Sequence, residues 1–246
     1  LLLAKDVGDF KAGTLISHFV DASEIDDGGE ERIGYITSED EGATWSDLEI
    51  ITLDDLPEDF IPVDPSVVQL EDKRLRLYFF DAAANVNLLK GETADSTFYS
   101  AVSEDGETFT FEGEIYSSDV SIITDPEVFW FEDSWLLYNP AFVKNKPWGP
   151  GEGQIQISKS KDGTNFEYLT TIDFEGIPGV MVEGGIISLF GCSKDGITRI
   201  FSEDGLSFDT SEVETLNPKL SGCDPDPVQL ENGTYVMMLK DSEKTK

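Results

Sequence analysis

The chain has 246 residues, of which 50 are acidic and 17 basic, so its formal net charge at pH 7 is −33. This charge argues against a nucleic-acid partner, because phosphate binding requires a basic surface, and it also opposes binding to anionic membranes. No apolar run approaches the roughly 20 residues needed to span a bilayer, so we expect no membrane insertion. We expect no cofactor, although the acidic composition is compatible with a structural calcium ion.

Two short motifs alternate along the chain. One is an acidic turn, Ser-x-Asp-Gly or Ser-x-Asp-x-Gly, that ends on an aromatic residue. The other is an Asp-Pro that leads into an apolar strand, a polar turn and a second apolar strand. In chain order, the acidic turns occur at 38–45, 103–109, 160–166 and 202–208, and the Asp-Pro hairpins at 64–80, 125–138 and 226–239.

The repeating unit has four antiparallel strands, which in the best copy are expected at 67–70, 75–80, 98–103 and 111–116. Units that recur every 40 to 65 residues or so are typical of a β-propeller, so we predict an all-β fold with one propeller domain over residues 1–246. The segment Leu2–Asp6 resembles the second strand at Met237–Asp241. The chain therefore appears cut within a unit at both ends. Counting the end pieces separately favours five blades, while merging them gives four, and an incomplete ring is the remaining alternative.

The acidic turns are predicted to be structural. Their Ser and Asp side chains can bond to their own backbone, Gly supplies a positive φ, and the aromatic residue packs between sheets. They are expected to join the third and fourth strands of each unit.

The two cysteines leave two alternatives open. Cys192 ends a predicted second strand and Cys223 stands just before the next Asp-Pro, so the two can be neighbours and form a disulfide. The alternative is two separate buried thiols. A zinc site is not expected, because His18 is the only histidine.

The long connection 139–154 contains Trp148 among prolines and glycines. Long loops in compact folds are often functional, and an indole face suits the C–H face of a sugar ring. We therefore consider Trp148 a candidate for substrate binding, with simple anchoring of the loop as the alternative.

The carboxylates are the best candidates for catalytic groups. A nucleophilic triad is not expected, because the chain has a single histidine and no Gly-x-Ser-x-Gly elbow. Asp64, Asp125 and Asp226 each open a predicted first strand, and first strands line the centre of a propeller. Clustered carboxylates shift one another's pKa, which suits the acid and base of glycoside hydrolysis. The alternative is that each Asp only caps the adjacent backbone.

The segment 125–138 resembles a blade opening of the five-bladed propeller glycosidases, the superfamily that includes families 43 and 32, and Asp64–Val67 looks the same. The resemblance implies that Asp64 is a general base and that Asp125 orients the acid and raises its pKa. Asp226 is a candidate for substrate binding from its place in the repeat. It also implies a glutamate acid in a Glu-Gly motif. Glu183 and Glu175 are the two candidates.

The acidic turns are similar to the Asp-box turns of sialidases. Those enzymes clamp an anionic sugar with three arginines, whereas this chain has four arginines in total and a net charge that repels an anion. We therefore do not expect sialidase activity.

Two functions remain open. One is a glycoside hydrolase-like propeller that acts on a neutral poly- or oligosaccharide. The other is a non-catalytic carbohydrate-binding or scaffolding module, with other domains of a larger protein as partners. Either function predicts an extracellular or cell-surface location.

Overall fold

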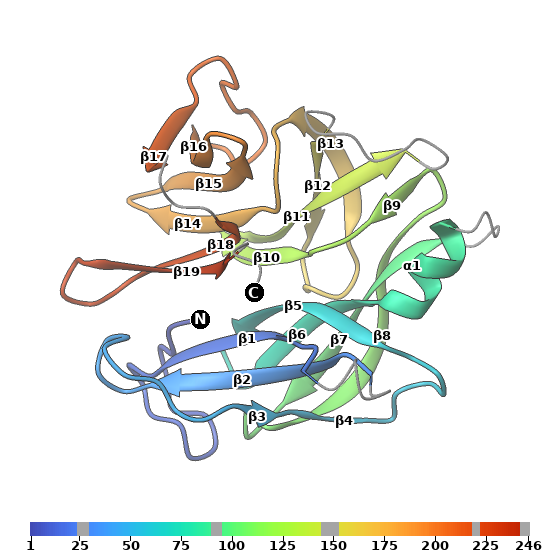
Figure 1. Cartoon of the computed structure of the whole chain (residues 1–246), viewed down its shortest axis with the longest axis vertical. Coiled ribbons are helices and arrows are strands. Elements are labelled where there is room, and N and C mark those ends of the chain that lie inside the picture. The colour runs from blue at the N-terminus through green and yellow to red at the C-terminus, as the bar shows by residue number, and fades with distance from the viewer. Residues whose placement is uncertain (24–29, 90–94, 144–152, 218–221, 242–246) are drawn as a thin grey trace. The chain divides into compact units, whose positions relative to one another are not determined.

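The structure is a computed structural model (Figure 1), and it describes residues 1–23, 30–89, 95–143, 153–217 and 222–241. Nearly all regular structure is strand, and the one helix of the described residues has eight residues. Within these ranges no helix is long and apolar enough to cross a membrane. The chain forms two compact units, Leu1–Val128 with a short piece at 143–145, and Phe129–Phe142 with Lys146–Lys246.

Unit 1 contains two sheets, of order β1-β2-β3 and β4-β8-β7-β6-β5. The strands of the first are β1 (Leu15–Asp21), β2 (Arg32–Ser38) and β3 (Glu49–Ile50). Those of the second are β4 (Thr52–Asp54), β5 (Pro62–Gln69), β6 (Leu75–Asp81), β7 (Ser96–Ser103) and β8 (Thr108–Ser118), and the short β9 (Ser121–Ile123) follows. The helix α1 (Ala82–Leu89) lies between β6 and β7 and begins where the Asp81 carboxylate accepts the N–H groups of Ala83 and Ala84.

Unit 2 contains sheets of order β10-β11-β12-β13 and β14-β15-β16-β17, and the two-stranded ribbon β18-β19. The first sheet comprises β10 (Glu127–Phe131), β11 (Ser134–Val143), β12 (Gln154–Ser160) and β13 (Glu167–Asp173). The second comprises β14 (Gly179–Glu183), β15 (Ile186–Ser193), β16 (Gly196–Ser202) and β17 (Glu214–Asn217). The ribbon consists of β18 (Gly222–Gln229) and β19 (Tyr235–Asp241).

The predicted order of strands and turns is confirmed. The second strands β6, β11 and β15 are central in their sheets. In β6 all residues from Leu75 to Phe80 are buried, which explains why five of these six residues are apolar or aromatic. Four sheets have at least three strands each, and the described part of the last sequence repeat has two strands, β18 and β19. This arrangement agrees with the four-bladed alternative, and the preferred count of five blades is not confirmed.

Each unit has its own apolar core between its sheets. The core of unit 1 includes Leu3, Ile33, Leu77, Phe79 and Phe109, and that of unit 2 includes Leu136, Tyr138, Ile157, Leu189 and Ile200. A smaller cluster in unit 2 joins β14 to β16 with the ribbon, through Met181, Phe190, Ile197, Met237 and Leu239.

The four acidic turns share one hydrogen-bond pattern, and they join the third and fourth strands as predicted. In the turn after β16, the Ser202 hydroxyl donates to Asp204 at 3.0 Å and accepts the Gly205 N–H at 2.9 Å. Asp204 then accepts the N–H groups of Leu206 and Ser207, both at 2.8 Å. The turns that begin at Ser38, Ser103 and Ser160 repeat this pattern.

The prediction of a second strand at Leu2–Asp6 is wrong. Leu2 forms only an isolated bridge with Leu15, and the strand equivalent to β6 is β1. The register shows this equivalence, because Leu15 pairs with Ser38 of an acidic turn just as Leu75 pairs with Ser103.

Candidate functional site

Three aspartates share an unusual backbone at the entrance end of a first strand, by which we mean its N-terminal end. Asp64, Asp125 and Asp224 have φ values of 49°, 48° and 54°. Non-glycine residues seldom adopt positive φ, and a residue before proline is normally extended, so each Asp-Pro is locally strained. At Asp64 and Asp224 the strand register also shifts, which marks a bulge. Strain of this kind concentrates at functional sites.

The prediction that Asp226 occupies the same position in its repeat as Asp64 is wrong by two residues. Ser66 pairs with Tyr78, the fourth residue of β6, and Asp226 pairs with Met238, the fourth residue of β19. Asp226 therefore stands at the position of Ser66, and Asp224 stands at the position of Asp64. The sequence does contain a signal for this equivalence, because Gln-Leu at 69–70 and at 229–230 follows Asp64 and Asp224 at the same spacing. The doubled Asp-Pro-Asp-Pro at 224–227 obscured that signal.

The structure brings the entrance end of β5 against the first two residues of β10, Glu127 and Val128, which belong to unit 1 although the rest of β10 belongs to unit 2. The Ser66 hydroxyl accepts the Val128 N–H at 3.1 Å and lies 3.4 Å from a Glu127 carboxylate oxygen. Asp64 lies two positions before Ser66, and Asp125 lies two positions before Glu127. The two predicted catalytic aspartates therefore occupy equivalent places on neighbouring first strands.

In unit 2 the same position on β14 is Gly179, which pairs with Phe190 as Ser66 pairs with Tyr78. A Cβ added to Gly179 would collide with the Pro225 carbonyl, so β14 and the Asp-Pro of β18 approach closely. Two positions before Gly179 stands Ile177, so this strand entrance has no equivalent of Asp64.

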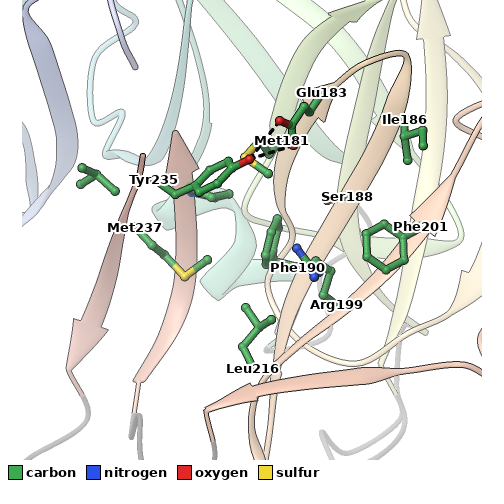
Figure 2. A pocket seen from close by; sticks show the side chains of 12 residues that line it. Met181, Glu183, Ile186, Ser188, Phe190, Arg199, Phe201, Leu216, Tyr235 and Met237 are labelled. Atoms are coloured by element: carbon green, nitrogen blue, oxygen red, sulfur yellow. Dashed lines mark hydrogen bonds between the residues drawn. The ribbon is translucent and has the colours of Figure 1, made fainter. Parts of the chain in front are cut away.

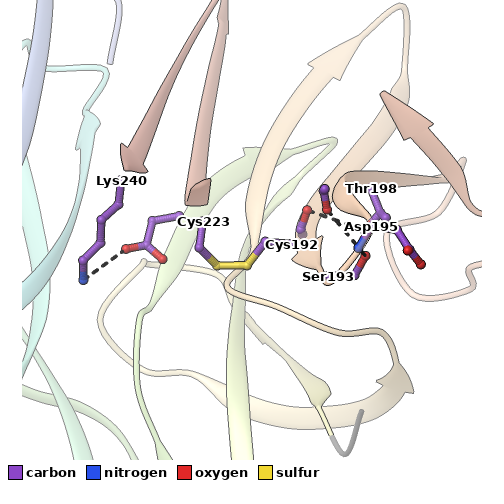
Figure 3. Close-up of a disulfide and its surroundings, with 9 residues drawn as sticks. Cys192, Ser193, Asp195, Thr198, Cys223 and Lys240 are labelled. Carbon is purple, nitrogen blue, oxygen red and sulfur yellow. Dashed lines mark hydrogen bonds and ion pairs between the residues drawn. A yellow bond between two sulfur atoms is a disulfide. The ribbon is translucent and has the colours of Figure 1, made fainter. Parts of the chain in front are cut away.

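Glu175 lies at this entrance, next to the disulfide. The backbone at 175–176 packs against Gly191 and Cys192 so closely that no side chain would be accommodated at Gly176 or Gly191. Cys192 is bonded to Cys223, with the Cα atoms 5.3 Å apart (Figure 3), which agrees with the disulfide alternative rather than with two separate thiols. Since Asp224 directly follows Cys223, the disulfide ties the strand that carries Asp224 to the neighbourhood of Glu175.

The environment of Asp224 alters its protonation. Burial raises its pKa, although Lys240, whose Nζ lies 3.6 Å from Oδ2, opposes the shift. Its Oδ1 is buried and has no hydrogen-bond partner among the described residues. A carboxylate that holds its proton more tightly than usual is suited to proton transfer or to donating a hydrogen bond.

Glu183 lies at the opposite end of β14, where Gly184 and Gly185 turn the chain into β15. Its carboxylate accepts the Tyr235 hydroxyl, with oxygen distances of 2.9 and 3.0 Å (Figure 2). It also accepts the Gln229 amide at 2.9 Å. Of the two predicted acids, only Glu175 is therefore at a strand entrance. The other predicted substrate-binding residue, Trp148, lies outside the described residues.

The charged groups offer neither an anion clamp nor a metal site within the described ranges. All four arginines are paired with carboxylates, namely Arg32 with Asp21, Arg74 with Asp72, Arg76 with Glu112 and Arg199 with Glu214. Within the same ranges, no three His, Cys, Asp or Glu side chains are grouped so that they could hold a metal ion.

Comparisons with known proteins identify the fold. No family model matches the chain, and no curated protein matches it. Among solved structures, a Bombyx mori GH32 β-fructofuranosidase aligns with a TM-score of 0.67 and 18% identity, over 97% of this chain and 55% of that enzyme. The chain thus spans little more than half of that enzyme's length.

Two further solved structures agree. An endo-1,4-β-xylanase of Bacteroides thetaiotaomicron aligns with a TM-score of 0.64 and 16% identity, over 92% of this chain and 80% of that one. An α-L-arabinofuranosidase of Fusarium graminearum gives 0.63 and 15%, over 98% and 70%. With the repeated four-stranded sheets, these likenesses show that the chain has a β-propeller fold of the kind found in glycoside hydrolases.

Proposed function

We propose that the chain is a glycoside hydrolase that cleaves a neutral poly- or oligosaccharide by carboxylate acid–base chemistry. The observation that carries the proposal is the strained Asp-Pro at equivalent strand entrances, with Asp64 and Asp125 on neighbouring strands. A backbone cap alone does not require a left-handed aspartate before proline. Neighbouring carboxylates, in contrast, meet the need of glycoside hydrolysis for groups in different protonation states.

In this proposal Asp64 is the general base and Asp125 orients the acid and raises its pKa. Glu175 is the acid in preference to Glu183, because Glu183 is a turn residue whose carboxylate already accepts hydrogen bonds from two donors, the Tyr235 hydroxyl and the Gln229 amide. The low identity of the solved structures leaves the sugar and the linkage to experiment.

The test is hydrolysis of neutral aryl glycosides and of arabinan-, xylan- and fructan-type oligosaccharides by the purified chain. Replacing Asp64 by Asn keeps the side-chain shape and tolerates positive φ, but it removes the base, so the rate should fall about a hundredfold or more. Asp59 is the matched control, because it is an exposed aspartate of the same unit with φ of 64°. Asp59→Asn should keep full activity.

A chain that cleaves none of these substrates, or an Asp64→Asn variant as active as the parent, would remove the catalytic proposal. Retained binding of the same oligosaccharides would then support the non-catalytic carbohydrate-binding module. We also propose an extracellular or cell-surface location, which the disulfide supports because such bonds persist in oxidising compartments.

A further inference from the structure

Two tryptophans on neighbouring strands form an exposed indole pair at the turn end of the β10–β11 hairpin. Only Glu132 and Asp133 separate β10 from β11, so Trp130 and Trp135 lie opposite each other beside the turn. Their ring centroids are 5.3 Å apart and their planes are inclined by 73°. Trp130 is 48% exposed, although tryptophan side chains are on average highly buried in folded proteins. The fold therefore leaves a large part of this indole ring in contact with water.

The repeat does not require a tryptophan at position 130. Trp135 is the residue of β11 that pairs with the serine of the acidic turn. In the hairpins β5–β6, β14–β15 and β18–β19, the residue that pairs with the equivalent of Trp135 is smaller, namely Gln69, Val182 and Gln229. The edge-on contact with Trp135 stabilises the hairpin, but it does not need the rest of the Trp130 ring to be exposed. A residue that departs from its repeat without a structural need is a candidate for function.

The acidic turn after β12 braces the hairpin turn beside the indole pair. The Lys161 ammonium donates to the Asp133 carboxylate at 3.0 Å, to the Asp133 carbonyl at 3.2 Å and to the Ser134 hydroxyl at 3.1 Å. The side chains of Lys161 and Asp133 nevertheless remain exposed. The indole pair is thus carried by a fixed backbone, with a carboxylate and an ammonium group at its edge.

The size and the chemistry of this patch suit a sugar rather than a protein. A tryptophan side chain has roughly 150–250 Å² of surface, so the exposed part of Trp130 is about 100 Å². A stable protein interface needs about 800 Å² from each partner, which the patch does not offer. The C–H face of a sugar ring can stack on the indole, while the sugar hydroxyls can bond to Asp133 and Lys161 at its edge.

The indole pair is remote from the strand entrance of the same hairpin. Asp125 precedes β10, whereas Trp130 is the fourth of the five residues of this strand. At about 3.3 Å per residue, five steps along a strand separate the two residues by roughly 17 Å. A sugar on Trp130 therefore does not occupy the Asp-Pro entrance.

We propose that Trp130 and Trp135 form an auxiliary binding site for a neutral polysaccharide. The ligand class rests on the proposed function, whereas the location rests on the indole pair itself. In this site Trp130 stacks on a ring of the polymer, Trp135 supports it edge-on, and Asp133 and Lys161 bond to the sugar hydroxyls. The site holds a polymer at a distance from the Asp-Pro entrance, so a short substrate does not need it.

The test is affinity electrophoresis of the whole chain in gels that contain soluble arabinan, arabinoxylan or levan, with Asp64→Asn present in every variant so that the polymer is not consumed. At least one polymer should retard the chain. Adding Trp130→Gln should weaken the affinity about fivefold or more, because glutamine suits this position in two other repeats but offers no ring. Trp130→Phe keeps a ring and should retain most of the binding. Tyr168→Gln is the matched control and should bind like the parent, because Tyr168 is a 51% exposed aromatic residue of β13, three strands away from β10.

Short substrates separate the failure of this site from the failure of the proposed function. With Asp64 intact, Trp130→Gln should hydrolyse aryl glycosides as fast as the parent does. A parent that cleaves no aryl glycoside but binds polymer through Trp130 would refute the catalytic proposal and support this site.

Oxidation of the parent decides the question if circular dichroism shows that Trp130→Gln does not fold. A saturating polymer should then slow the oxidation of Trp130 by N-bromosuccinimide about fivefold, as mapped by mass spectrometry. The site is overturned if no polymer retards the chain, if folded Trp130→Gln binds like the parent, or if the polymer leaves Trp130 unprotected. It is also overturned if light scattering shows a dimer of the parent that Trp130→Gln abolishes, because a second copy then covers the indole pair.

Discussion

His18 is expected to make the stability of unit 1 depend on pH, and replacing it by phenylalanine should remove that dependence. Its ring lies between Tyr35, at 5.9 Å, and Phe109, at 6.3 Å. Although the residue is partly exposed, its Nε2 is buried and has no hydrogen-bond partner among the described residues. Burial lowers the pKa of His18 from 6.5 to about 3. Tyr138 and Phe190 are equivalent to His18, because each is three positions after the residue that pairs with the serine of its own sheet's acidic turn. Both are aromatic, so phenylalanine suits the site.

The sign follows from proton linkage. Because the folded-state pKa is lower than the unfolded one, the unfolded chain binds more protons at this residue below pH 6.5. The stability is therefore fully present above pH 6.5 and is lost as the pH falls towards 3. Each pH unit in this window costs about 1.4 kcal/mol, so the loss from this residue reaches roughly 2 kcal/mol at pH 5.

The assay is urea unfolding of the parent and of His18→Phe at pH 7.5, 6.5, 5.5 and 5.0, values chosen to stay above the titration of most carboxylates. The free energy of unfolding of the parent, minus that of the variant, should fall by roughly 2 kcal/mol between the first and last pH. If the two proteins lose stability in parallel, the histidine is hydrated or partnered in the folded state and the reasoning is refuted.

Three other substitutions test the contacts of unit 2, each by the free energy of unfolding in urea. Replacing both Cys192 and Cys223 by serine should cost about 3–4 kcal/mol, since the bond closes a loop with a sequence separation of 31; an unchanged stability would mean that the bond does not form in solution. Asp204→Ala removes the acceptor for two backbone N–H groups, which hold the pKa of Asp204 at about 2, and should cost about 1 kcal/mol. Tyr138→Phe should cost about 1–2 kcal/mol, because the Gly205 carbonyl loses its buried donor. A loss below about 0.5 kcal/mol would contradict either of these last two assignments.

The all-β repeat and the acidic turns could be predicted from the sequence because each depends on local chemistry. A Ser-x-Asp-Gly turn closes within four residues, so the residues that it needs are adjacent in the chain. The disulfide was only one of two alternatives, because the repeat indicates that Cys192 and Cys223 can be neighbours but not that they are bonded. For the acidic turns, the Ser, Asp and Gly residues that bond to one another are all visible in one short sequence motif.

The candidate site was harder to predict, because a bulge changes the register without a clear sequence mark. Asp224-Pro225-Asp226-Pro227 offers two Asp-Pro pairs, and only the strand pairing shows that Asp226 takes the place of Ser66. Glu183 and Glu175 are both followed by glycine, yet Glu183 lies at the turn after β14 and Glu175 lies at the entrance of that strand. Which carboxylates reach the entrances is decided by where each bulge falls.

The aspartates of the acidic turns differ from Asp224 in how their carboxylate oxygens are used. The aspartates of the acidic turns use their oxygens on their own backbone, so their ionised form is already committed to holding a turn. Asp224 holds the same left-handed backbone as Asp64 and Asp125 but leaves one buried oxygen without a partner in the described ranges. Both the strained backbone of an aspartate and a buried carboxylate oxygen without a partner lower the stability of the fold. A bound molecule that pairs with this oxygen would explain why the fold keeps such a residue. In the proposed function, the substrate therefore binds at the Asp-Pro entrances rather than at the more numerous acidic turns.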